Sequence, residues 1–143
     1  MPDYAKNVVV LGATGSIGRS TMAVLAASEG RLRPVALSGH ANVDILESQA
    51  RQFHPRQIVV TDPEAAHRRD WSGLPADCEL LVGPEAVAKV VAEPDVDVVV
   101  SAIVGSAGLD GTWAALEAGK TVALANKESL VVGGPLVTRL AAE

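Results

Sequence analysis

The stretch Val8–Thr21, VVVLGATGSIGRST, decides the fold. An apolar run typical of a buried strand ends at a glycine, two more glycines follow at three-residue spacing, and the pattern then becomes helical. The three glycines have separate roles, since Gly12 permits a tight turn, Gly15 lets the backbone approach a ligand, and Gly18 lets the helix lie close to the strand. The N–H groups at the positive helix end favour a pyrophosphate, so the stretch predicts a dinucleotide site. Glycines required for packing alone are the competing interpretation.

Short apolar runs and helical periods alternate along the rest of the chain. The expected strands are Asn7–Leu11, Pro34–Leu37, Gln57–Thr61, Leu80–Val82, Val96–Val100 and Thr121–Ala125. The expected helices are Ser16–Ser28, Val43–Phe53, a short one from Pro63, Pro84–Val91, Gly108–Glu117 and Pro135–Ala142. Strands separated by helices form parallel sheets with right-handed crossovers. The order therefore predicts an α/β fold with a Rossmann-like, doubly wound, mainly parallel sheet and helices on both faces.

Two further expectations concern the environment of side chains. The buried side of the first helix is expected to use Ile17, Met22, Val24 and Leu25. Arg68 and Arg69 follow the short third helix beside Asp70, and a solvated surface is the expected environment of this basic pair.

Composition narrows the class of protein. The 143 residues suit one domain, and the net charge of −5 argues against a general affinity for nucleic acid. No apolar run approaches the roughly 20 residues of a membrane span, and the start of the chain lacks a signal-peptide layout. The single cysteine, Cys78, excludes an intrachain disulfide and is expected to be an ordinary thiol near a strand start. These features favour a cytoplasmic protein that binds neither nucleic acid nor membrane.

The end of the second strand favours NADP over NAD. Sites for NAD usually place an Asp or Glu there on the ribose 2′-hydroxyl. Here the strand runs into SGHAN (38–42), and no carboxylate comes before Asp44. The side chains of Ser38, His40 and Asn42 are expected to donate hydrogen bonds to a 2′-phosphate. A solvent-exposed loop histidine is the competing interpretation of His40.

Two later segments follow strand ends, the edge at which open α/β sheets bind ligands. The small residues of SAIVGSAG (101–108) let a nicotinamide or ribose lie close, or serve packing alone. Asn126, Lys127 and Glu128 form a polar run after the last expected strand. Lys127 faces either an anionic substrate or solvent, and Glu128 either accepts from a ribose or caps the following helix.

Three segments together resemble the N-terminal part of the 1-deoxy-D-xylulose 5-phosphate reductoisomerase family. They are LGATGSIGRST (11–21), SAIVGSAGL (101–109) and GKTVALANKESLV (119–131). The run ANKESLV is the most specific, because a general dinucleotide fold does not require it. The resemblance covers nearly the whole chain in order.

The resemblance implies an oxidoreductase of the non-mevalonate isoprenoid pathway. Family members rearrange and reduce 1-deoxy-D-xylulose 5-phosphate to 2-C-methyl-D-erythritol 4-phosphate, using NADPH and a divalent metal, magnesium or manganese. By motif, the resemblance implies NADPH contacts at Thr14, Gly15, Ser16, Ile17, Asn42, Asn126 and Glu128, and a contact with the sugar phosphate substrate at Lys127. Asn42 would lie near the 2′-phosphate. Ala41 stands where some members have a lysine, and His40 is expected to compensate.

Family members are much longer, so the resemblance implies that residues 1–143 are an NADPH-binding domain cut before the catalytic and C-terminal domains. The metal ligands would then lie beyond residue 143, and the whole enzyme would be a homodimer. This chain alone would bind NADPH weakly and would not turn over substrate. Two alternatives stay open. One is another NADP-dependent oxidoreductase, of the semialdehyde dehydrogenase or dihydrodipicolinate reductase type. The other is a dinucleotide-sensing module that is not an enzyme.

Overall fold

The computed structural model describes residues 5–103 and 108–124. These residues form six strands and five helices. The strands are β1 (Lys6–Leu11), β2 (Leu32–Gly39), β3 (Gln57–Val60), β4 (Glu79–Val82), β5 (Val98–Ser101) and β6 (Thr121–Leu124). The helices are α1 (Ser16–Ala26), α2 (Val43–Phe53), α3 (Pro63–His67), α4 (Glu85–Val91) and α5 (Gly108–Glu117). The expected helix Pro135–Ala142 and the strand end at Ala125 lie outside the described residues.

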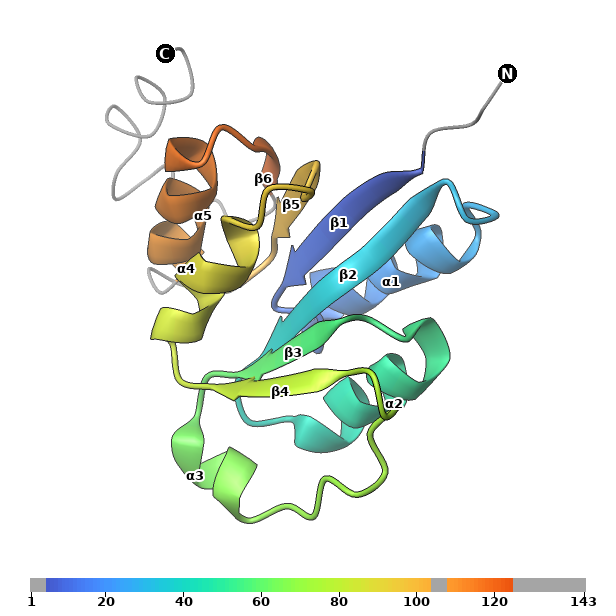
Figure 1. The fold of residues 1–143 in the computed structure, drawn as a ribbon, viewed down its shortest axis with the longest axis vertical. Coiled ribbons are helices and arrows are strands. Elements are labelled where there is room, and N and C mark those ends of the chain that lie inside the picture. Colours follow the sequence, from blue (N-terminus) through green and yellow to red (C-terminus); the bar gives the residue numbers. More distant parts are fainter. Residues whose placement is uncertain (1–4, 104–107, 125–143) are drawn as a thin grey trace.

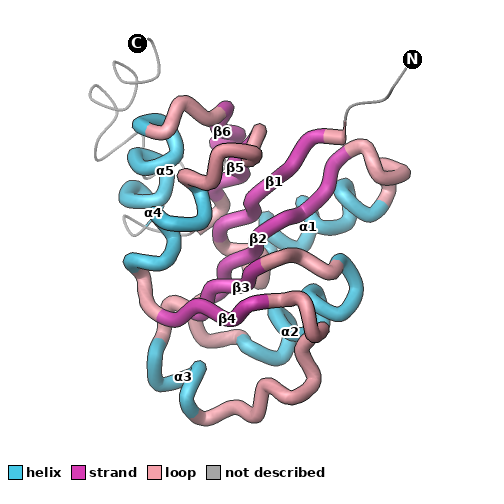
Figure 2. The backbone as a smooth tube through the Cα atoms, viewed as in Figure 1, coloured by secondary structure: helices cyan, strands magenta, loops and turns pink. Residues whose placement is uncertain are grey.

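The six described strands form one parallel sheet in the order β4-β3-β2-β1-β5-β6, which Figure 2 shows side by side. The chain builds outward from β1 to β4 and then crosses to β5, on the other side of β1. The carboxyl ends of β1 and β5 therefore meet at a topological switch point, where sheets of this kind bind ligands. The predicted α/β class and the doubly wound, Rossmann-like topology are confirmed.

Strand β1 separates two apolar cores. Its side chains alternate, because successive residues of a strand point to opposite faces. Val8 and Val10 contribute to the core beneath α1, α2 and α3, whereas Val9 and Leu11 contribute to the core beneath α4 and α5. Figure 1 shows α1 and α2 on one face of the sheet and α4 and α5 on the other, so the prediction of helices on both faces is confirmed.

Strand β2 is longer than expected, because it begins before Pro34 and continues to Gly39. Proline has no N–H to donate, and the pairing with β1 shifts at this point. Val8 pairs with Pro34 but Val9 pairs with Ala36, which leaves Val35 as an extra residue. The extension past Leu37 brings the residues that follow β2 to the carboxyl edge of the sheet.

The expected buried face of α1 is partly wrong. Met22 and Leu25 are buried, but Ile17 is 50% exposed and Val24 is 62% exposed. The third buried position is Gly18. Because Gly18, Met22 and Leu25 are spaced at four and three residues, they form one helical stripe, and Ile17 and Val24 lie beside it.

The expectation of a solvated basic pair after α3 is wrong for Arg69. Its guanidinium forms ion pairs with Asp44 and with Glu47 of α2, at 2.6 Å from Glu47 Oε1. The Glu47 side chain is only 4% exposed, and Arg69 also lies 5.6 Å from the ring centroid of Trp71. These contacts fasten the loop of residues 68–78, seen between α3 and β4 in Figure 2, to helix α2.

Candidate functional site

A cavity of about 520 Å³ lies at the carboxyl edge of the sheet. Its lining includes Gly12, Thr14 and Gly15 after β1, Ser38, Gly39 and His40 at the end of β2, Thr61 after β3, and Ala102 and Ile103 after β5. Most small-molecule sites are concave pockets of this kind with a few convergent polar groups. The fold thus brings together three segments that are far apart in the sequence. They are the glycine loop, which runs from Gly12 to Gly18, the end of the second strand and the start of the 101–108 segment.

The three glycines of the first loop differ in the space around them. Gly12 has φ +80°, and a Cβ there would lie 2.8 Å from the backbone oxygen of Ala102. A Cβ on Gly18 would lie 2.0 Å from the oxygen of Gly12. At Gly15 the nearest atom to an added Cβ is 3.7 Å away. The predicted turn at Gly12 is confirmed. A close approach is also present at Gly18, but it is to the loop residues Gly12 and Ala13 rather than to the strand, and space remains around Gly15.

Helix α1 presents a positive end to the cavity. The helix begins at Ser16 with Gly15 as its N-cap, no side chain in the described residues caps it, and its first turn has no acidic residue. The other described helices each have an acidic residue there, namely Asp44, Glu64, Glu85 and Asp110. The dipole of α1 is therefore not offset by a carboxylate in its own first turn, which suits a phosphate group, and the carboxylate that lines the cavity is Asp110 of α5.

The glycine loop is held from behind by three hydrogen bonds. Ala13 N donates to Ser38 O at 2.8 Å, and Gly12 N donates to Ser38 Oγ at 3.0 Å. Gln49 of α2 donates from Nε2 to Ala13 O at 2.8 Å. Ser38 is 1% exposed, so the expectation that it faces a 2′-phosphate is wrong: its hydroxyl positions the loop. Gln49, also buried, is a positioning residue that the sequence did not indicate.

His40 and Asn42 lie beyond the end of β2, where both are exposed. The His40 ring does not extend freely into solvent, because its Nδ1 lies 2.9 Å from Thr61 Oγ1. Asn42 is the N-cap of α2, yet its side chain makes no capping hydrogen bond among the described residues. Thr61 was not predicted as a site residue, although its place at the end of an expected strand was a usable signal.

Of the remaining predicted site residues, the structure describes those of the first loop but not those after β6. Thr14 lies near the end of β2, since a Cβ on Gly39 would be 3.1 Å from Thr14 Cγ2. Ser16 and Ile17 are exposed in the first turn of α1. The polar run Asn126, Lys127 and Glu128, together with residues 104–107, lies outside the described residues.

Cys78 lies away from this site, immediately before the edge strand β4 and at its amino end. Burial, with a smaller contribution from the charge of Asp77, raises the pKa of its thiol to about 11. The thiolate is the reactive form of cysteine, and at neutral pH a thiol with this pKa is almost entirely protonated. The expectation of an ordinary thiol near a strand start is confirmed in position, and the raised pKa does not suit a nucleophile.

We expect iodoacetamide to alkylate Cys78 about a hundredfold more slowly at pH 8 in the native chain than in the same chain unfolded in urea. The reason is the smaller thiolate fraction at the raised pKa. The measurement is the rate of mass increase under the two conditions, with free cysteine as a reference for the intrinsic effect of urea. Equal rates in the native and unfolded chain would contradict the burial of this thiol.

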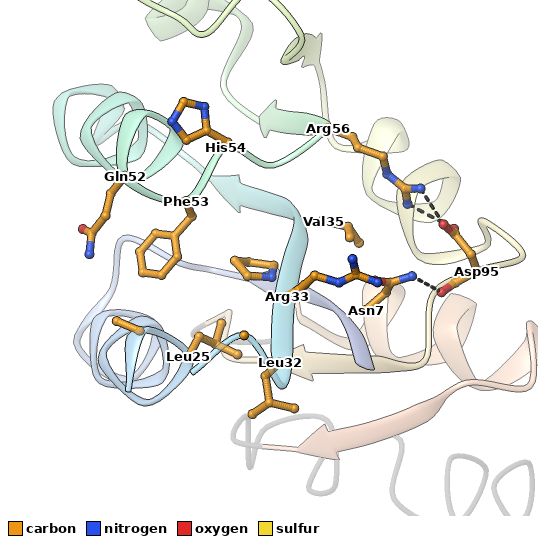
Figure 3. Close-up of a pocket in the computed structure, with 13 residues that line it drawn as sticks. Asn7, Leu25, Leu32, Arg33, Val35, Gln52, Phe53, His54, Arg56 and Asp95 are labelled. Atoms are coloured by element: carbon orange, nitrogen blue, oxygen red, sulfur yellow. Dashed lines mark hydrogen bonds and ion pairs between the residues drawn. The ribbon is translucent and has the colours of Figure 1, made fainter. Parts of the chain in front are cut away.

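A second hollow, of about 610 Å³, lies at the opposite, amino edge of the sheet (Figure 3). Arg56 donates two hydrogen bonds to the Asp95 carboxylate, at 2.5 and 3.1 Å, and Asn7 Nδ2 donates to Asp95 O at 2.9 Å. The Arg56 guanidinium holds the pKa of Asp95 below its ordinary value. Both side chains are about half exposed, so the pair contributes at most about 1 kcal/mol to stability.

This amino-edge hollow is a poorer candidate for a phosphate site. Residues at the carboxyl ends of α1 and α2, such as Ala26 and Phe53, line it. The negative ends of two helix dipoles therefore face it and offset the charge of Arg33, while Arg56 is already paired with Asp95. The glycine-loop cavity, with the positive end of α1, is the candidate functional site.

Two other kinds of site are not found in the described part of the chain. Within residues 5–103 and 108–124, no three His, Cys, Asp or Glu side chains are grouped closely enough to hold a metal ion. Among the same residues, no helix has the length and apolar character needed to cross a membrane.

The chain is similar to proteins of one enzyme family. The family model of 1-deoxy-D-xylulose 5-phosphate reductoisomerase matches residues 8–134. The reductoisomerase of Methylococcus capsulatus is 50% identical over 135 residues, which cover 92% of this chain and 34% of that protein. The chain therefore spans about a third of the length of the curated relatives that it matches.

Solved structures of two such enzymes have the same fold. A DOX-P reductoisomerase in complex with NADPH, fosmidomycin and magnesium is 42% identical, with a TM-score of 0.86 over 96% of this chain and 34% of that one. The reductoisomerase of Zymomonas mobilis in complex with NADPH is 37% identical, with a TM-score of 0.87 over 96% of this chain and 36% of that one.

Proposed function

The chain belongs to the 1-deoxy-D-xylulose 5-phosphate reductoisomerase family, and we propose on this premise that residues 1–143 form the NADPH-binding domain of such an enzyme. The observation that supports a dinucleotide most strongly is the cavity that joins the glycine loop and the positive end of α1 to His40 and Thr61. A cavity at a helix N-terminus suits a pyrophosphate, and polar side chains beyond the second strand suit a ribose.

The phosphate end of the site rests on the first loop. Thr14, Gly15, Ser16 and Ile17 surround the N-terminus of α1, where the backbone N–H groups of the first turn have no partner within the helix. In this proposal these groups donate to the pyrophosphate, and the space at Gly15 lets the phosphates come close. Because Ser38 and Gln49 hold the loop in place before the cofactor binds, the loop loses little conformational entropy when NADPH binds.

The adenosine end of the site rests on His40 and Asn42. Both side chains are exposed beyond the carboxyl end of β2, the position from which such sheets select between NAD and NADP. The first carboxylate after β2 is that of Asp44, which is paired with Arg69. The proposed cofactor is therefore NADPH, with His40 and Asn42 hydrogen-bonded to its 2′-phosphate.

The proposed reaction of the whole enzyme is the rearrangement and reduction of 1-deoxy-D-xylulose 5-phosphate to 2-C-methyl-D-erythritol 4-phosphate. NADPH supplies the hydride, and this chain binds and orients it. We propose NADPH contacts for Asn126 and Glu128 and a substrate contact for Lys127. The magnesium or manganese ion would be held by residues outside the described part. A homodimer, a cytoplasmic location and the absence of turnover by this chain alone belong to the same proposal.

The test is a titration of the 143-residue chain with NADPH and with NADH, followed by calorimetry and by nicotinamide fluorescence. We expect NADPH to bind at least tenfold more tightly than NADH. A tenfold difference in Kd corresponds to about 1.4 kcal/mol, which charge-assisted hydrogen bonds to the 2′-phosphate are strong enough to supply. Tighter binding of NADH would overturn the choice of cofactor. Failure of both dinucleotides to bind would overturn the proposed site.

A further inference from the structure

The side chain of His40 is tied to the end of the neighbouring strand. Its Nδ1 lies 2.9 Å from Thr61 Oγ1, and the Thr61 hydroxyl is within 3.4 Å of Gly39 O, to which it donates. The backbone N–H of Thr61 donates to the same oxygen at 2.9 Å. A chain of hydrogen bonds therefore runs from the backbone of β2 through Thr61 to the imidazole, and both His40 and Thr61 line the glycine-loop cavity.

This arrangement decides which part of the imidazole is available to a ligand. A histidine ring has two nitrogens, and a threonine hydroxyl has one proton and two lone pairs. With Nδ1 occupied by Thr61, Nε2 is the ring nitrogen left for a ligand. The bond between Nδ1 and the Thr61 hydroxyl forms with either atom as the donor. In the neutral tautomer with its proton on Nε2, the Thr61 hydroxyl donates to Nδ1 instead of to Gly39 O, and Nε2–H donates to a phosphate oxygen.

The surroundings of the pair suit a phosphate better than a ribose hydroxyl. Asp62, the acidic residue next to Thr61, accepts a hydrogen bond from Glu64 N at the start of α3. Asp44 is paired with Arg69. Both carboxylates are thus engaged in contacts of their own, while a histidine held by a hydroxyl provides a donor.

We propose that Thr61 is a positioning residue for cofactor selection: it holds His40 in the orientation that recognises the 2′-phosphate of NADPH and thereby favours NADPH over NADH. The inference rests on the proposed function, since it concerns the same dinucleotide site. Thr61 acts through His40 and makes no contact of its own with the cofactor in this proposal. Fixing the ring before binding lowers the entropy lost when the phosphate is bound.

The test uses Thr61→Val, which removes the hydroxyl but keeps the size of the side chain and the backbone hydrogen bond to Gly39. We expect the Kd for NADPH to rise about five- to tenfold, with the Kd for NADH unchanged within about twofold. Thr61→Ser, which restores the hydroxyl, is expected to restore the affinity for NADPH. Thr121→Val, an exposed threonine at the start of β6, is the matched control and should bind both dinucleotides as the unaltered chain does.

A double variant shows whether Thr61 acts through His40. His40→Ala alone is expected to weaken NADPH binding by at least as much as Thr61→Val. The variant with both substitutions should then bind no more weakly than His40→Ala, because the second change removes a contact that no longer exists. Additive losses would overturn the inference.

The other outcomes are equally distinct. If Thr61→Val binds NADPH as tightly as the unaltered chain, or loses NADPH and NADH alike, Thr61 does not select the cofactor and the inference fails, while the proposed function stands. If the unaltered chain binds neither dinucleotide, the proposed function fails and the inference fails with it. Thermal unfolding of each variant verifies that the fold is retained.

Discussion

Substitution of Gly18 by alanine is expected to lower the free energy of unfolding by about 3 kcal/mol or more, and the melting temperature by about 10 °C. A Cβ at this position would lie 2.0 Å from Gly12 O and 2.7 Å from Ala13 Cα. These are backbone atoms of a loop that Ser38 and Gln49 hold in place, so they have little freedom to move away. The measurement is unfolding in urea, followed by circular dichroism.

The sign of this effect separates two explanations of Gly18. Glycine inside a helix is about 1 kcal/mol less favourable than alanine, so helix propensity alone predicts that Gly18→Ala raises the stability of the chain. Close approach of α1 to the loop predicts the opposite. An unchanged or raised stability would therefore contradict the packing described around Gly12 and Gly18.

The sequence predicted the elements that local patterns determine. Helices α2 and α5 begin and end at the expected residues, Val43–Phe53 and Gly108–Glu117. The glycine triplet was informative because its spacing combines a turn with a close helix contact, and both are present at Gly12 and Gly18. Patterns of this kind act within a few residues, so one sequence is sufficient to recognise them.

The expectations that were wrong concern contacts between distant segments. The buried stripe of α1 was misplaced, because one of its members is Gly18, which adds nothing to an apolar pattern. Arg69 is paired with Glu47 of α2, which is 22 residues away in the sequence. Ser38 faces the glycine loop rather than a ligand. Each contact depends on how strands and helices meet, which periodicity does not specify.

The second large effect is expected at Gly15, where alanine should weaken NADPH binding on the order of a hundredfold, or about 2.7 kcal/mol, without unfolding the chain. The backbone of Gly15 has φ −77°, which any residue adopts, and the nearest atom to an added Cβ is 3.7 Å away. The methyl group instead occupies the space in which we propose that the pyrophosphate approaches the first turn of α1. Calorimetric titration with NADPH measures the loss.

The two glycine variants are controls for one another. The free energy of unfolding of Gly15→Ala should lie within about 1 kcal/mol of that of the unaltered chain. Glycine is preferred over alanine at an N-cap, but this loss is offset because alanine reduces the entropy of the unfolded state. Gly18→Ala should lose stability, and a loss of binding there would follow from the displaced loop. NADPH binding that survives Gly15→Ala would show that the phosphates do not approach this residue. A stable chain with Gly15→Ala that no longer binds NADPH is the result that only a ligand at the N-terminus of α1 explains.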